Sequence, residues 1–310
     1  MQKCKGERTR ASNSSFISSQ SAMEYLMTYG WAILIIAIVL VALFSLGVFN
    51  SSNFSPRAQP GSCEVFRTSA QTSLGGQCNG MLPEYVAQFN GLGGDNGTST
   101  GNINPNTYGE SYINLPKNIL GSGSITKLTY TAWIKTDWSD GGNGIIGIGT
   151  AGFQTGDCGT LCLHQCNSGD SGVSISTPLN NNQYYFVAVT LNSSSTANTL
   201  TFYIDNESAI TTTAELPSVG GYANIGSIAC FGYYFNGNIA NIQLYNASLS
   251  GSEVQALYKE GIGGAPIDLQ NLVGWWPLNG NANDYSGYGN DGTATNVTYT
   301  SAWTSGYSAP

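Results

Sequence analysis

The chain has 310 residues, of which only 9% are charged, and its 18 acidic and 10 basic residues give a net charge of −8 at pH 7. Nucleic-acid phosphates and anionic lipid surfaces both attract clustered Lys and Arg, so this composition argues against either kind of partner. The 40 glycines and 18 tyrosines are typical of a chain with many short strands and turns.

The first predicted element is a helix over residues 20–49. This segment carries one carboxylate, Glu24, and has neither a charge nor a proline from Trp31 onward. About 18 apolar residues are enough to cross a bilayer as a helix. Residues 1–19 hold four basic residues against one acid, and basic flanks tend to stay in the cytoplasm. We therefore expect a membrane-inserted helix with a cytoplasmic N-terminus, and everything after Asn50 outside the cell.

The junction before this helix reads SSQSAMEYL and resembles the class III signal of archaeal type IV pilins and related filament subunits. The resemblance implies that a prepilin peptidase cleaves between Ser19 and Gln20 and removes the leader 1–19. It also implies that the helix becomes the core of a homopolymeric filament built by the pilus assembly machinery. Glu24 is then the fifth mature residue, where the family carries its glutamate, and its expected partner is the free amine of Gln20 on a neighbouring helix.

A plain signal anchor, with Glu24 as a chance acid at the lipid interface, is the alternative interpretation of this segment. A carboxylate costs about 2.5–3.5 kcal/mol at the centre of a bilayer on insertion scales. A partner in an assembled bundle removes that cost, so the presence of Glu24 favours the filament over the anchor.

Cysteine usage predicts a disulfide framework outside the cell. Cys4 lies in the leader, and an even number of cysteines follows it, which is typical of an oxidising compartment. Six cysteines allow fifteen pairings, of which we favour a local Cys63–Cys78 bridge. A metal site built from the central cysteines and His164 is the competing interpretation, disfavoured because the spacing lacks a CxxC pair and exposed thiols oxidise outside the cell. The six cysteines are Cys63, Cys78, Cys158, Cys162, Cys166 and Cys230.

Seven Asn-x-Ser/Thr tripeptides after the leader offer glycan acceptors on an exported chain. They begin at Asn50, Asn53, Asn96, Asn192, Asn206, Asn246 and Asn296. Glycans at these positions would mask a sheet surface that carries few charges.

Residues 50–84 are predicted to form a linker and a cysteine-framed segment, because Pro56 cannot continue the helix. From Tyr85 the sequence turns to short apolar or alternating runs between glycines, which predict strands. The single helical pattern in this part is Ser250–Gly261, which begins with serine caps and an early acid. Many short strands without intervening helices indicate an antiparallel β-sandwich or jelly roll. We therefore expect a mainly β fold behind a long N-terminal hydrophobic α-helix.

The order of the strand phrases resembles the laminin-G-like, concanavalin-A-like jelly roll. Between Tyr85 and Tyr258 the chain reads FNG, SYINLP, YTAWIKT, QYYFVAVTLN, LTFYIDN, NIGS and FNGNIANIQLYNASLSGSEVQALY. The phrase that usually begins such domains stands last here, as LVGWWPLNGNANDYSGYGNDGTATNVTYT at residues 272–300. The resemblance therefore implies a circularly permuted domain over residues 85–310.

Two placements of this displaced segment are open. It closes the sheet of its own domain, which we favour, or it is donated to the sheet of the next subunit. In the family the first strand borders the last, so LVGWWPL should pair with the strand around Ile239–Leu244 and GTATNVTY should lie beside Tyr85–Phe89. Trp275 and Trp276 should point to opposite faces of the sheet.

Calcium is the cofactor that the jelly-roll resemblance implies, at a rim loop whose acid and amide positions match Asp284, Asn290 and Asp291. Calcium takes six to eight oxygen ligands. The same residues can instead make turns, since Asn-Asp-Gly is turn chemistry in its own right, and both interpretations stay open here. The family often has two acids in its last strand, where this chain has Ala240 and Asn241.

Catalysis is not expected from this sequence. It lacks the run of paired carboxylates that a glucanase of this fold needs, and its one histidine gives little support to a Ser-His-Asp arrangement. Sugar binding would instead use exposed aromatic rings, for which the candidates are Trp138, Tyr222, Tyr233 and Tyr234.

Together these patterns predict a structural subunit of an extracellular type IV pilus-like filament. The helix would form the filament core, and the jelly-roll head would be exposed at the cell surface for adhesion, with a glycan as one candidate ligand. A monomeric membrane-anchored lectin-like receptor is the alternative, and a surface glycan hydrolase is the third interpretation.

Overall fold

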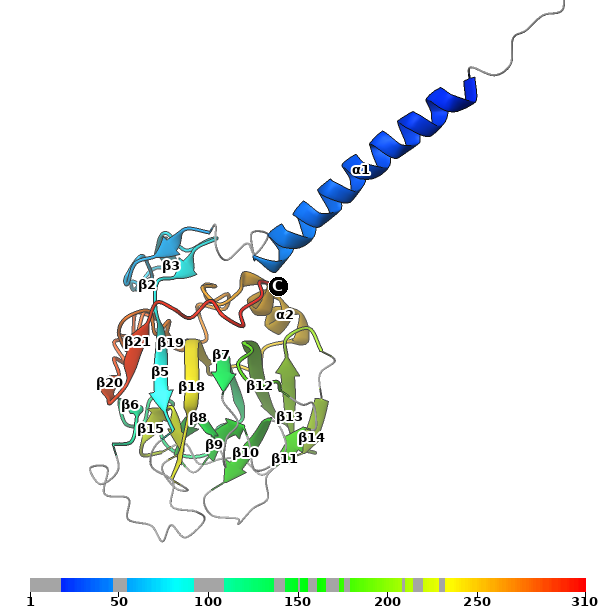
Figure 1. Ribbon diagram of the computed structural model, residues 1–310. Coiled ribbons are helices and arrows are strands. Elements are labelled where there is room, and N and C mark those ends of the chain that lie inside the picture. The colour runs from blue at the N-terminus through cyan, green and yellow to red at the C-terminus, as the bar shows by residue number, and fades with distance from the viewer. Residues whose placement is uncertain are drawn as a thin grey trace, which may run out of the picture. The chain divides into compact units, whose positions relative to one another are not determined.

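The computed structural model describes residues 18–46, 55–91, 109–136, 143–149, 151–155, 161–165, 173–175, 179–207, 210–213, 220–228 and 232–310. The chain divides into two compact units, Met1–Asn50 and Ser51–Pro310, and each is treated by itself below (Figure 1).

The first unit contains helix α1, Ser18–Ser45, which begins two residues before the predicted start. Its large apolar side chains are exposed to solvent, for example Trp31 at 66% and Phe44 at 73%. Among the helices of the described part of the chain, none is both long enough and apolar enough to cross a membrane. The prediction that residues 20–49 cross a membrane therefore gains no support from this finding.

The second unit, which we call the head, is built from two antiparallel sheets that face each other across a shared core (Figure 1). In the described residues one sheet has seven strands, in the order β11-β10-β9-β8-β15-β6-β20. The other has eight, in the order β14-β13-β12-β7-β18-β5-β21, with β19 paired to β18 off that path. This arrangement confirms the predicted mainly β sandwich and is consistent with a jelly roll.

The strands of the seven-stranded sheet are β6 (Tyr112–Leu115), β8 (Asn143–Ile148), β9 (Ala151–Thr155), β10 (Leu161–Gln165), β11 (Val173–Ile175), β15 (Ala223–Ile225) and β20 (Thr293–Thr295). Those of the eight-stranded sheet are β5 (Val86–Asn90), β7 (Lys127–Thr136), β12 (Tyr185–Ser193), β13 (Asn198–Ile204), β14 (Ile210–Thr213), β18 (Asn236–Tyr245), β19 (Leu272–Trp276) and β21 (Thr298–Thr300).

Smaller elements surround the sandwich. Strands β2 (Cys63–Arg67) and β3 (Thr72–Gly76) form a hairpin, and β1 (Arg57–Ala58) runs parallel to β4 (Leu82–Pro83). Strands β16 (Ser227–Ile228) and β17 (Tyr233–Tyr234) form a second short hairpin. Helix α2 covers Gly251–Glu260.

A hydrophobic core fills the space between the two sheets. The alternation of β7 sends Leu128, Tyr130, Ala132 and Ile134 into it, as expected when side chains alternate along a strand. Burial of such side chains is the dominant favourable term in folding, at about 25 cal/mol per Å² of apolar area.

A second hydrophobic cluster lies on the other face of the eight-stranded sheet, so that this sheet is buried on both sides. It joins Trp133 and Phe186 of the sheet to Leu257 of α2 and to Trp303 and Tyr307 near the C-terminus. Aromatic rings dominate it, and Trp133 stacks on Tyr258 with ring centroids 6.0 Å apart. The C-terminal segment is therefore part of the folded head rather than a loose tail.

Helix α2 begins where the sequence predicts. Ser250 and Glu253 form a capping box, each side chain bonding the other residue's backbone, which satisfies N–H groups that have no partner inside the helix. Val254 and Leu257 are buried against the second cluster.

The displaced C-terminal segment closes the sheets of its own chain. Strand β19 pairs with β18 through Ile242↔Trp276 and Gln243↔Trp275, and β21 pairs with β5 through Tyr299↔Ala87. Both pairings were predicted, and both are confirmed. Trp276 lies in the core between the sheets and Trp275 in the second cluster, so the two rings point to opposite faces as expected.

Asp205, which follows β13, links this strand to β12 and to helix α2. Its Oδ1 accepts a hydrogen bond of 2.7 Å from the Phe186 N–H, and the Gln255 amide donates to its carbonyl oxygen at 3.3 Å. Burial raises the pKa of the Asp205 carboxyl from 3.8 to about 6, the Phe186 N–H opposes this shift, and the charge of Glu207 adds to it. The charged form of Asp205 therefore destabilises the folded head.

We expect residues 55–310 alone to form a folded monomer, because β19, β20 and β21 pair with strands of the same chain. Light scattering coupled to size-exclusion chromatography should give the mass of one chain, with cooperative unfolding by circular dichroism. Concentration-dependent chains that dissociate when residues 272–300 are deleted would instead indicate a strand donated between subunits.

We expect Asp205→Asn to raise the melting temperature at pH 7.5 but to have little effect near pH 4. The pKa of the Asp205 carboxyl is higher in the folded state than in the unfolded state. Protonation of Asp205 therefore stabilises the folded head as pH falls from about 6 toward 4, and its ionisation destabilises the head above that window. The asparagine oxygen can still accept from the Phe186 N–H. Melting curves of both proteins between pH 4 and 8 test this, with Glu207→Gln as the control. It should keep most of the pH dependence, because burial is the largest cause of the Asp205 pKa shift and the charge of Glu207 is the smallest. Parallel curves at all pH values would contradict it.

Candidate functional site at Trp275

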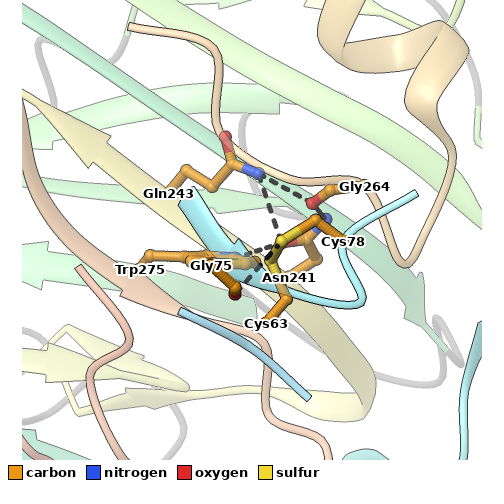
Figure 2. The surroundings of a disulfide bond; sticks show 7 residues. All are labelled: Cys63, Gly75, Cys78, Asn241, Gln243, Gly264 and Trp275. Atoms are coloured by element: carbon orange, nitrogen blue, oxygen red, sulfur yellow. Dashed lines mark hydrogen bonds between the residues drawn. A yellow bond between two sulfur atoms is a disulfide. The ribbon is translucent and has the colours of Figure 1, made fainter. Parts of the chain in front are cut away.

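A small cavity of about 40 Å³ opens beside the disulfide of the β2–β3 hairpin. Its walls come from four parts of the sequence: Cys63 and Cys78 of the hairpin region, Asn241 of β18, Ile262 in the loop after α2, and Trp275 of β19. One water needs about 10–15 Å³ of such space, so the cavity has room for a few water molecules. The disulfide, a group of buried amides and the Trp275 ring lie close together around it (Figure 2).

A network of buried amides lies beside this cavity, which Asn241 lines. Asn241 has a left-handed backbone (φ 50) at an irregularity in the pairing of β18 with β7. Its Oδ1 accepts from the Trp275 indole N–H at 2.8 Å, and its Nδ2 donates to the Gly264 carbonyl at 2.8 Å. Gln243 donates to both acceptors and itself accepts from the Tyr245 hydroxyl at 2.6 Å. Because these side chains satisfy one another, the network fixes the Trp275 ring (Figure 2).

The disulfide closes the hairpin that forms one wall. Cys63 and Cys78 are bonded, which is the pair favoured from the sequence, and the Cys78 sulfur lies 3.4 Å from the Gly75 carbonyl oxygen (Figure 2). Gly76 has φ 92, and a Cβ there would meet the Ser62 carbonyl oxygen at 2.0 Å. Only glycine fits this close approach of the two chain segments.

Arg67 fastens the hairpin to the C-terminal part of the head. Its guanidinium donates to the carbonyl oxygens of Ser286 at 2.8 Å, Leu269 at 2.8 Å and Leu272 at 3.0 Å. It also stacks on the Tyr288 ring at 4.0 Å. One side chain near the N-terminus of the head thus holds both ends of the segment that contains β19.

Asp284 closes the loop that follows β19. Its Oδ1 accepts from the backbone N–H groups of Trp275 at 2.9 Å and Ser286 at 2.8 Å. Its Oδ2 accepts from the Ser286 hydroxyl at 2.8 Å and the Asn290 N–H at 2.9 Å. The Asp284 N–H in turn donates to Asp291 Oδ1 at 2.8 Å.

The three predicted calcium ligands are therefore together in space, but both oxygens of Asp284, the central one, are already occupied by hydrogen-bond donors. Asp284 has four donors on its two oxygens, which is the full capacity of a carboxylate. The Asn290 side-chain amide nitrogen donates to the Val273 carbonyl, and the Asn290 backbone carbonyl accepts from the Trp276 indole N–H. Among the described residues, no group of three or more His, Cys, Asp or Glu side chains could hold a metal ion. This arrangement does not fit a calcium site and agrees with the turn interpretation.

Other predicted site residues fall in several places. Ser19, Gln20 and Glu24 lie in α1, where their side chains are not described, so their roles in processing and assembly stay predictions. Cys162 is disulfide-bonded, which removes its thiolate from the competing metal interpretation. Further predicted residues lie outside the described part of the chain: Cys158, Cys166, Cys230, Trp138, Asn50, Asn53 and Asn96.

The glycan acceptors that are described all lie at the surface. Asn192, Asn206, Asn246 and Asn296 are exposed. Asn296 differs from the others because its amide donates to the Glu110 carbonyl at 3.0 Å, and a glycan on that nitrogen would alter this bond. Glycosylation at these residues stays a prediction.

The aromatic candidates for sugar stacking are only partly accessible. Tyr222 and Tyr233 are half-buried, and Tyr234 is 8% exposed and packs against Tyr112 with ring centroids 6.2 Å apart. Burial raises the pKa of Tyr234 to about 12, with the charge of Glu110 adding to the shift. None of these three rings is an open platform for a sugar.

Sequence reasoning missed Arg67 and the Asn241 network. Arg67 is four residues from Cys63 and is one of only 10 basic residues in the chain, so its rarity could have drawn attention to it. Asn241 and Gln243 stand among apolar residues of a strand that is buried on both faces, and buried amides of this kind need partners.

Comparison with known proteins agrees with the sandwich. Residues 107–255 match the Concanavalin A-like lectin/glucanases superfamily. The matched stretch runs from just before β6 into α2 and leaves out the C-terminal segment 272–300. No curated protein matches the chain.

Several solved structures are similar to the head at low sequence identity. A proposed carbohydrate binding protein from Bacteroides ovatus is 17% identical over 71% of this chain and 61% of that one, with a TM-score of 0.48. A heptameric SAP-like pentraxin from Limulus polyphemus is 16% identical over 69% and 94% of the two chains, with a TM-score of 0.45. Domain 4 of the arabinanase AbnA from Geobacillus stearothermophilus is 14% identical over 65% and 84%, with a TM-score of 0.40. Residues 107–255 are thus similar to a concanavalin-A-like superfamily, and the structure gives the head a two-sheet sandwich that is consistent with a jelly roll.

Proposed function

We propose that this chain is a structural subunit of an extracellular filament of the archaeal type IV pilus kind. A prepilin peptidase removes the leader 1–19, and the pilus assembly machinery packs α1 with copies of itself into the filament core. The jelly-roll head is displayed at the cell surface for adhesion.

The observation that carries this proposal is the apolar surface of α1. Every residue from 31 to 44 is apolar, and the four consecutive side chains from Ile33 to Ile36 are 49–65% exposed. Successive residues of a helix point about 100° apart, so these four side chains surround the axis. A helix that is apolar on all sides needs a cover of lipid or of other helices. The pilin-like junction SSQSAMEYL favours other helices as that cover.

The closed sheets of the head support a proposal in which the helix polymerises and the head is displayed. Strands β19, β20 and β21 complete the sheets of their own chain, so the head has no need to exchange these strands with a neighbour. Disulfide bonding at Cys63, Cys78 and Cys162 supports display outside the cell, because disulfides persist in oxidising compartments. In this proposal the helix forms the contacts between subunits, and the head is exposed to the surroundings of the cell.

We also infer that the displayed head binds a glycan. The support is the match of residues 107–255 to a superfamily whose description names lectins. That description names glucanases as well, but the acids of this chain are scattered singly, which favours binding over hydrolysis. An acidic head with a net negative charge further favours a neutral or weakly cationic ligand over an anionic one.

We expect the mature chain to begin at Gln20 and Glu24→Ala to abolish or strongly impair filament assembly. The carboxylate is proposed to pair with the amine of Gln20 on a neighbouring helix, and its removal leaves that amine without a partner. N-terminal mass analysis checks the cleavage, and electron microscopy of cells counts the filaments.

Glu260→Ala is the matched control, because it removes the same charge from an exposed position of the head and should leave filament number unchanged. A mature protein that keeps Met1, or one cut after Phe49, would contradict the pilin-like processing. Normal filaments from the Glu24→Ala protein would instead favour a monomeric membrane-anchored receptor.

We expect the head, residues 55–310, to retain a subset of glycans on an array of neutral and charged oligosaccharides. Isothermal titration with a retained oligosaccharide should show saturable binding, which the thermally unfolded head should lose. If no oligosaccharide is retained, the glycan part of the proposal fails and the filament part still stands.

A further inference from the structure

We propose that the Asp284 carboxylate takes the structural place that the jelly-roll resemblance assigns to a calcium ion, so that the head folds and keeps its shape without calcium. The inference concerns the loop between β19 and β20, residues 277–292. It does not depend on whether the head binds a glycan or the helix forms a filament.

The geometry around Asp284 is that of an anion enclosed by donors. Three backbone N–H groups and one hydroxyl, from Trp275, Ser286 and Asn290, lie 2.8–2.9 Å from its two oxygens. Hydrogen bonds to a carboxylate are roughly twice as strong as those between neutral groups. Four of them on one side chain tie the end of β19 to the turn at residues 286–290.

A calcium ion cannot share these oxygens while the four bonds exist. Calcium requires six to eight oxygen ligands at about 2.3–2.6 Å, and each N–H that points at Asp284 directs its positive end into the position a cation would occupy. The neighbouring Asp291 Oδ1 is also engaged, by the Asp284 N–H at 2.8 Å. Calcium binding here would have to break the bonds that give the loop its shape.

The strand beside the loop lacks the acids that the resemblance expects there, which fits a loop that needs no cation. The resemblance expects acids at positions 240 and 241, but the chain has Ala240 and Asn241. Asn241 accepts the indole N–H of Trp275, while Asp284 accepts the backbone N–H of the same residue. Trp275 is thus held from both sides by protein acceptors.

The loop is also fastened at its edges by protein groups. The Ser286 carbonyl accepts a hydrogen bond from the Arg67 guanidinium at 2.8 Å, and the Tyr285 carbonyl accepts one from the Val65 N–H at 2.8 Å. The Asn290 amide reaches back to the Val273 carbonyl at 2.9 Å. Hydrogen bonds from the hairpin and to β19 therefore hold the edges of the loop, as the hydrogen bonds to Asp284 hold its centre.

The experiment compares thermal unfolding of the purified full chain, kept in detergent, in millimolar calcium chloride and in excess EGTA. The wild-type melting temperature should be the same in both, and calorimetric titration of calcium into the chelator-treated chain should show no saturable heat. Asp284→Asn should lower the melting temperature by roughly 5–10 °C in both buffers. This variant replaces one of the two carboxylate oxygens by an amide nitrogen, and each oxygen accepts from at least one backbone N–H, so at least one N–H loses its acceptor.

Asp291→Asn is the matched control. A calcium site would need both aspartates, whereas Asp291 accepts a single bond from the Asp284 N–H, which an asparagine oxygen can also accept. We expect its melting temperature to stay within about 2 °C of the wild type.

Two results would overturn the proposal. The first is a melting temperature that rises with calcium in the wild type and loses this response in both variants, which would assign a calcium site to the loop. The second is an Asp284→Asn protein as stable as the Asp291→Asn protein, which would show that the carboxylate does not hold the loop.

Discussion

The pairing of β19 with β18 is the interaction on which the rest of the head depends. It adds Trp276 to the core between the sheets and Trp275 to the cluster on the opposite face, so one five-residue strand contributes a large ring to each. Fully burying a large apolar side chain contributes about 1.5–3 kcal/mol, and both rings depend on the same register. A shift of β19 by one residue would exchange their faces and disrupt both clusters at once.

This register is protected by contacts that come from outside the sheet. Asp284 holds the Trp275 backbone, Asn241 holds its indole, and Arg67 binds the carbonyl of Leu272 at the start of the strand. None of the three belongs to a strand-to-strand ladder. The polar groups around β19 therefore specify its position, while the apolar clusters supply most of the free energy of burial.

Much of this fold was predictable from local pattern, and much of the site was not. Alternation and turn residues predict the strands and helix α2, and the resemblance of LVGWWPL to a displaced first strand predicts its pairing with β18. The role of Asp284 was left open because the same Asp-Asn-Asp spacing suits a cation and a turn equally, and only the positions of N–H groups from Trp275 and Ser286 distinguish them. Arg67 was missed because its acceptors lie about 200 residues away in sequence.

In the proposed filament, a pull on the head would act on the contacts near its N-terminal end. Near that end, Arg57 lies over the Trp303 ring at 5.3 Å and the Ala58 carbonyl accepts from Asn279 at 2.9 Å. Trp303 donates in turn to the Pro83 carbonyl at 3.2 Å. The N-terminal segment is thus bound to the C-terminal segment before the chain reaches β5. In the proposed filament such a pull would reach β18 through two strands, because β5 and β19 both pair directly with it.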